Sequence, residues 1–125
     1  MSRSELVEDI LIDCNDDWLM EANVISLVKA DTELEDPAAI RREVIAVVAD
    51  VVSRGWAELG DTPKGMGFRP WTLPLDEAVD RLNRRWDGSS EAYPFGGEVF
   101  WLRSTPEGDA EAAKILDRWN NGDVP

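Results

Sequence analysis

The sequence predicts a small α+β domain with about five helices and an antiparallel sheet of two or three strands. Several segments carry apolar residues at helical spacing, two short segments have the pattern of strands, and Gly- and Pro-rich stretches separate them. A length of 125 residues suits a single domain, which we expect to span residues 1–125. A mainly helical bundle with the strands as a minor hairpin is the alternative that these patterns leave open.

The third predicted helix organises the rest of the chain. Asp36 is suited to cap its first turn, Pro37 fits the first helical position, and Gly55 can adopt the left-handed conformation that ends a helix. Between them, apolar residues recur on one face: Ile40, Val44, Val47, Val48 and Val51. Residues 56–59 then alternate apolar and polar side chains, as a half-buried strand does. We therefore expect a mostly buried helix that leads directly into a strand.

The remaining elements follow the same rules in chain order. Apolar spacing predicts helices from residue 4 to about 13, over 17–30 and over 74–86, and a last helix that Thr105 caps and residues 120–122 end. Residues 98–103 read as a strand that pairs with 56–59. Residues 68–71 are expected to be an edge strand at best, because Pro70 cannot donate a ladder hydrogen bond. We expect Trp18, Trp86 and Trp119 to lie in the core.

The composition argues against several functional classes. The chain has no histidine and one cysteine, Cys14, so it lacks imidazole metal ligands, His-dependent triads and an intramolecular disulfide. No constellation of residues with the spacing of a catalytic site stands out. We expect a cytoplasmic protein that is not an enzyme, needs no cofactor or metal and does not enter a membrane.

The negative charge is unevenly distributed. The net charge is −13, and residues 1–36 alone carry 11 acidic and two basic side chains, a net −9. Such a field repels a polyanion such as DNA and attracts a basic protein. Glu33, Glu35 and Asp36 are our candidates for acidic residues that bind a protein partner. The alternative interpretation is that the charge serves solubility alone.

The aromatic residues give one further candidate. Trp71 lies in an irregular stretch, and we expect it to be partly exposed and to contribute to protein binding. It could form a patch with Phe68, Tyr93 and Phe95, which leaves open a sensor for a small ligand. Core cover beneath a long loop explains the same residues equally well.

Two local phrases resemble winged helix-turn-helix domains of the MarR and PadR kind. One is S-R-G-W-A-E-L-G at 53–60, where the third helix ends, and the other is V-F-W-L-R-S-T-P-E-G-D-A-E-A at 99–112. The resemblance covers residues 6–116 and implies a winged-helix fold whose wing strands are 56–59 and 99–103. The departure is an insertion at about 61–97, which carries its own helix.

The resemblance implies a second function, a DNA-binding transcriptional regulator. In that case Arg41 and Arg42, near the start of the third helix, would contact the major groove, and the terminal helices could form a homodimer. The alternative is that the two arginines form a solvated pair that neutralises the acidic residues just upstream. On charge grounds we favour an acidic protein-binding module of immunity, antitoxin or regulatory type over the DNA-binding regulator.

Overall fold

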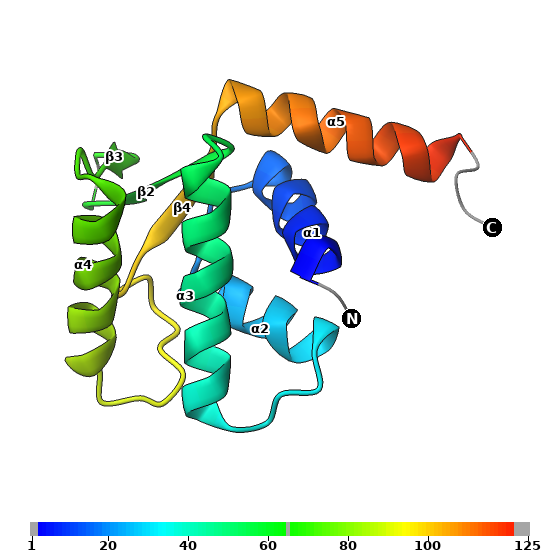
Figure 1. Cartoon of the computed structure of the whole chain (residues 1–125). Coiled ribbons are helices and arrows are strands. Elements are labelled where there is room, and N and C mark those ends of the chain that lie inside the picture. The colour runs from blue at the N-terminus through cyan, green and yellow to red at the C-terminus, as the bar shows by residue number, and fades with distance from the viewer. Residues whose placement is uncertain (1–2, 65, 122–125) are drawn as a thin grey trace.

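The computed structural model describes residues 3–64 and 66–121 and has five helices and a four-stranded antiparallel sheet in this part of the chain (Figure 1). The elements are α1 (Arg3–Asp16), β1 (Leu19–Met20), α2 (Glu21–Asp31), α3 (Pro37–Ser53), β2 (Ala57–Asp61), β3 (Arg69–Pro70), α4 (Leu75–Asp87), β4 (Trp101–Ser104) and α5 (Pro106–Asn120). The predicted α+β class is confirmed. None of the described helices combines the length and the apolar character that a membrane crossing requires.

Helix α3 buries its apolar face in the core, as its sequence predicts. The Oδ2 atom of Asp36 accepts a hydrogen bond from the Ala39 N–H at 3.1 Å, and the helix begins at Pro37. Its five apolar stripe residues are all buried: Ile40, Val44, Val47, Val48 and Val51. Gly55 has φ +77° and ends the helix, after which the chain turns into β2. Figure 1 shows α3 with α4 on one side and α1 and α2 on the other.

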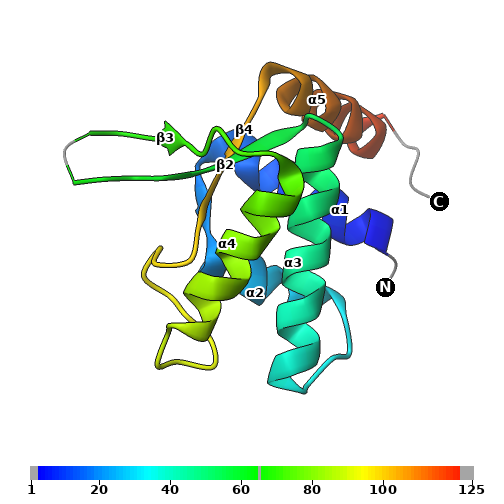
Figure 2. The same cartoon turned by 60° about the vertical axis from the view of Figure 1, so that its left-hand side comes forward.

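The sheet has the strand order β1-β4-β2-β3. β2 pairs with β4 in the expected antiparallel sense, with Leu59 opposite Leu102, and Leu102 is also opposite Leu19 of β1. All three leucines are buried, so this row joins the sheet to the core. β3 is an edge strand on the far side of β2, and Figure 2 shows the hairpin that joins them extending away from the helices. The sheet has one strand more than the largest number predicted, because a two-residue strand forms at each edge.

Three predictions about the helices were wrong. The second helix begins at Glu21 rather than at residue 17, because Leu19 and Met20 pair with β4 as a strand. Trp18 therefore lies outside any helix and is 38% exposed, with its ring 5.6 Å from that of Phe68. Trp119 is 44% exposed because the last turns of α5 extend beyond α1 (Figure 1). Trp86, by contrast, is buried as expected. Gly122, part of the predicted end of the last helix, lies outside the described residues.

A buried carboxyl group fixes the chain ahead of β4. Glu21, the first residue of α2, is 0% exposed, and its Oε2 atom accepts a hydrogen bond from the Val99 N–H at 3.1 Å. Burial raises the pKa of Glu21, while hydrogen bonds from backbone N–H groups, chiefly that of Val99, oppose the rise. This contact joins the start of α2 to the segment that follows the 88–98 loop, and the periodicity of the sequence gives no sign of it.

The start of α5 is packed directly on the turn that follows α3. Thr105 caps α5 by accepting a hydrogen bond from the Gly108 N–H at 3.0 Å, and its own hydroxyl donates to the Gly55 carbonyl at 2.6 Å. The backbone N–H of Thr105 also donates to the Trp56 carbonyl at 3.1 Å. A Cβ atom on Gly108 would lie only 1.9 Å from that Trp56 oxygen. A glycine is therefore required here by packing, in the first turn of a helix.

We predict that Gly108→Ala lowers the free energy of unfolding by about 1–3 kcal/mol, because α5 must move away from Trp56 to admit the methyl group. Without that clash alanine would favour a helix. Gly96→Ala is the matched control, since a Cβ atom there meets nothing within 4 Å, and its effect should stay within about 0.5 kcal/mol. Urea unfolding followed by circular dichroism measures both. Equal stabilities for the two variants would contradict the packing described here.

Candidate functional site

The predicted acidic residues lie together on the connection between α2 and α3. Glu33, Glu35 and Asp36 are all exposed there. Asp36 also caps α3, so part of its charge is used within the molecule. Glu33 and Glu35 have no such role in the helix cap and are the two residues of this group best placed to meet a partner.

A second group of carboxylates lies beside this connection, on α1 and at the end of α2. Asp9 and Asp13 are one turn apart on α1, and both face Asp31, the last residue of α2. Lys29, the basic residue in the last turn of α2, is directed elsewhere, with its Nζ atom 3.7 Å from the centre of the Tyr93 ring. We call Asp9, Asp13, Asp31, Glu33 and Glu35 the acidic face.

The electrostatic cost of this arrangement appears in the pKa of Asp9. Partial burial, a hydrogen bond with the Asp31 carboxyl group and the negative charges of Asp31, Asp13 and Glu8 raise the pKa of Asp9 to about 7. Burial and the charges of Asp16 and Asp31 also raise the pKa of Asp13. The acidic face therefore repels itself at neutral pH and favours the approach of a proton or another cation. Within residues 3–64 and 66–121, no group of three His, Cys, Asp or Glu side chains is arranged to hold a metal ion.

Trp71 is partly exposed, as expected, but the contacts described for it are with residues of the same molecule. Its indole N–H donates to Asp61 Oδ2 at 3.0 Å, and the guanidinium groups of Arg81 and Arg85 each lie 4.9 Å from the centre of its ring. Arg85 also forms an ion pair with Asp61 at 2.6 Å. Burial acts to raise the pKa of Asp61, but the hydrogen bonds from Arg85 and Trp71 and the positive charges of Arg85 and Arg81 together outweigh it and hold the pKa below its ordinary value. The group ties β2 to α4.

The other aromatic residues expected near Trp71 have different surroundings. Phe68 is largely buried, with the Arg103 guanidinium 4.3 Å from its ring centre and Trp18 on another side. Tyr93 is half-buried beneath Lys29, while Phe95 is 68% exposed. The ring contacts described for Phe68 and Tyr93 thus join them to residues other than Trp71.

Arg41 is occupied by contacts with α4. Its guanidinium donates to the backbone and side-chain oxygens of Asn83 at 3.1 and 3.0 Å and forms an ion pair with Asp87 at 2.9 Å. It also lies 5.5 Å from the centre of the Trp86 ring. Arg42, by contrast, is exposed. Arg41 therefore acts as a tie between α3 and α4, and only the second of the two arginines is presented to solvent.

One face of α3 is covered. Its exposed residues are Pro37, Ala38, Arg42 and Ser53, and its other residues are buried or half-buried. α2 packs on one side of it and α4 on the other. A recognition helix reads DNA through polar side chains on its exposed face. The uncovered face of α3 presents Arg42, Ala46, Ala49, Asp50 and Ser53, of which only Arg42 and Ser53 are fully exposed.

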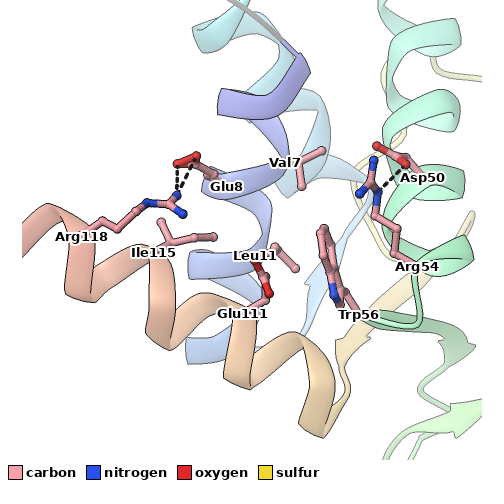
Figure 3. A pocket seen from close by; sticks show the side chains of 9 residues that line it. All are labelled: Val7, Glu8, Leu11, Asp50, Arg54, Trp56, Glu111, Ile115 and Arg118. Atoms are coloured by element: carbon pink, nitrogen blue, oxygen red, sulfur yellow. Dashed lines mark hydrogen bonds and ion pairs between the residues drawn. The ribbon is translucent and has the colours of Figure 1, made fainter. Parts of the chain in front are cut away.

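A pocket of about 280 Å³ opens between α1, the end of α3 and α5 (Figure 3). Four apolar side chains from three parts of the chain form its wall: Val7, Leu11, Trp56 and Ile115. Trp56 is held in place through its backbone, since its N–H donates to Val51 and its carbonyl accepts from Thr105, both at 3.1 Å. The backbone of Trp56 is therefore fixed, and its indole supplies an apolar surface at the side of the pocket.

Charged side chains surround this pocket and are paired with one another. Arg118 of α5 forms an ion pair with Glu8 of α1 at 3.2 Å, and Arg54 forms one with Asp50 at 2.9 Å (Figure 3). The Arg54 guanidinium also lies 5.1 Å from the centre of the Trp56 ring. Glu111, on the same side as Arg118, pairs with Lys114 at 3.6 Å. Exposed pairs of this kind are weak and exchange readily with charges on a partner.

The sequence contains only incomplete signals for the acidic face and for the pocket beside Trp56. Glu5, Asp9 and Asp13 recur at four-residue intervals on α1, which indicates an acidic stripe, but nothing in the sequence places Asp31 against it. The pocket depends on α5 crossing close to α1, a contact between residues about 110 positions apart, such as Arg118 and Glu8. Periodicity assigns Trp56 to a strand but cannot show that its ring faces a cavity.

We predict that Asp9→Asn stabilises the protein at pH 8 by about 1–2 kcal/mol, a value reduced from the full pKa shift because solvent screens this partly exposed group. Folding raises the pKa of Asp9, so protonation of Asp9 favours the folded state. That contribution is complete below about pH 4 and is lost as the pH rises through about 7.

The advantage of the Asn variant should accordingly shrink as the pH falls from 8 to 5 in urea titrations. Glu91→Gln, at an exposed position in the loop after α4, is the control and should change stability little at either pH. A stability difference between Asp9→Asn and the natural protein that does not depend on pH would show that Asp9 does not titrate as described.

No family model matches the chain, and neither a curated protein nor a solved structure matches it. The resemblance of residues 53–60 and 99–112 to winged helix-turn-helix domains therefore stays an expectation. The features that bear on function are the distribution of charge, the few fully exposed polar residues of α3 and the pocket beside Trp56.

Proposed function

We propose that this chain is a non-enzymatic recognition module of winged-helix type that binds a basic protein through its acidic face. The observation that carries the proposal is the group of carboxylates on α1, α2 and the following connection, where partial burial of Asp9, its hydrogen bond with Asp31 and the nearby negative charges raise the pKa of Asp9 to about 7. Groups that repel one another in the free protein gain most from a cationic partner. Neutralisation of a basic protein, as an immunity or antitoxin-type protein achieves, is the mode of action that fits this charge.

The energetics favour a partner that carries lysine or arginine. A cation placed beside Asp9 and Asp31 interacts with both carboxylates and removes the repulsion between them, so it gains more than it would beside one isolated carboxylate. The net charge of −13 adds a long-range attraction that speeds the encounter with a basic protein. Both effects weaken as salt is added, because the acidic face is near the surface.

The order of the elements supports the winged-helix part of the proposal. The resemblance rests on an order of three helices and a strand, then a strand and a helix, which α1, α2, α3, β2, β4 and α5 have, whereas β1 was not expected. The expected insertion supplies β3 and α4, and α4 covers α3. A winged helix whose third helix has so few fully exposed polar side chains is better suited to binding through another surface than to reading DNA.

We predict that the double variant Glu33→Lys/Glu35→Lys binds a short lysine-rich peptide at least tenfold more weakly than the natural protein at low salt. Fluorescence anisotropy of the labelled peptide measures the affinity. Glu77→Lys/Asp80→Lys, at exposed positions on α4, makes the same change in net charge away from the acidic face and should weaken binding by less than about threefold. Circular dichroism confirms that both variants fold.

Two results would contradict the proposal. If both double variants weaken binding equally, the peptide responds to net charge rather than to the acidic face. If the natural protein binds labelled duplex DNA more tightly than the peptide, and Arg42→Ala abolishes that binding, the DNA-binding function is the correct one.

A further inference from the structure

The pocket beside Trp56 combines features that mark the centre of a protein interface. Its wall is apolar, its tryptophan is fixed through the backbone, and charged side chains surround it (Figure 3). Tryptophans in pockets that a partner can seal from water are among the residues that contribute most to binding between proteins. The contacts described above that stabilise the fold do not depend on whether this pocket is empty or filled.

We infer that this pocket receives one aliphatic side chain of the basic partner, flanked in the partner by lysine or arginine. The inference rests on the proposed function and adds to it the point where the partner is anchored. The apolar wall of Val7, Leu11 and Ile115 would surround the side chain, and the face of Trp56 would close one side. The acidic face alone would select only for charge, whereas this pocket selects for a particular pattern in the partner's sequence.

The position of the pocket connects it to the acidic face. Glu8 lies at the mouth, in its ion pair with Arg118, and the negative charge of the same Glu8 helps to raise the pKa of its neighbour Asp9. Helix α1 therefore carries the pocket on one flank and the acidic face on the other. A basic segment lying across α1 would place cations against the acidic face and an adjacent apolar side chain at the pocket.

The charges at the mouth also favour a cationic flank. The carboxylates of Glu8, Asp50 and Glu111 line the pocket, and their partners Arg118, Arg54 and Lys114 have side chains 48%, 54% and 71% exposed. Such exposed basic side chains can move aside at little cost, which leaves the carboxylates for a lysine or arginine of the partner.

The occupant is better explained as a side chain than as a small molecule or a second copy of this chain. A volume of about 280 Å³ is at the lower limit of pockets that enclose small ligands, but it is ample for one aliphatic side chain. A second copy would also carry a net charge of −13, so two copies repel one another as they approach. A basic partner meets neither objection.

The experiment compares two lysine-rich peptides that differ only at the centre, where one has leucine and the other glycine. The natural protein should bind the leucine peptide about tenfold more tightly, as expected for burial of one aliphatic side chain. Glu111→Trp, which places a large ring at the mouth, should remove this preference. Asp117→Trp, at an exposed position on the same helix with the same change in charge, should keep it. Thermal unfolding shows whether both variants fold.

The outcomes separate this inference from the proposed function. Equal affinity for the two peptides would overturn the pocket anchor while leaving recognition by charge intact. Loss of the preference in Asp117→Trp as well as in Glu111→Trp would also overturn it, because the effect would not depend on the mouth of the pocket. Failure of both peptides to bind would refute the proposed function itself. A sedimentation mass that doubles with concentration and falls in Glu111→Trp would assign the pocket to a second copy.

Discussion

The burial of α3 is the constraint on which the rest of the structure depends. Its valine-rich face packs against α1 and α2 on one side, and α4 packs against another side of the helix. The helix ends at Gly55, which places Trp56 at the junction with α5. Because one face of α3 is used in the core and few polar residues on its other face are fully exposed, the outer helices offer the larger charged surface for recognition. The acidic face on α1 and α2 and the pocket between α1 and α5 are both consequences of that burial.

The α+β class and most elements could be predicted from local chemistry. The Asp36 cap, the left-handed Gly55 and the alternation after it are short-range signals, and each had the predicted structure. The errors arose where a tertiary contact overrides a local pattern. Leu19 and Met20 continue a helical periodicity, yet pairing with β4 makes them a strand. Trp119 continues the apolar stripe of α5, but the helix extends beyond the surface that would cover it.

The candidate site was predictable only in part, for a related reason. The charge of the first 36 residues led to Glu33 and Glu35, whereas the opposition of Asp9 to Asp31 depends on how α1 packs against α2. Composition also could not distinguish an arginine that is exposed to solvent from one that binds another helix. Arg41 and Arg42 are neighbours in sequence, but α4 binds the first and leaves the second exposed. The glycine of T-P-E-G likewise fits any helix start, and only the Trp56 carbonyl explains it.

The central claim is that the closely spaced carboxylates on α1 and α2 bind a cationic partner. The most direct measurement is the pKa of Asp9 from carboxyl carbon chemical shifts in NMR, with and without a saturating lysine-rich peptide. The account predicts a pKa of about 7 in the free protein and a clearly lower value in the complex, because the partner's cations stabilise the charged form. An ordinary pKa in the free protein, or a raised one that the bound peptide leaves unchanged, would contradict it.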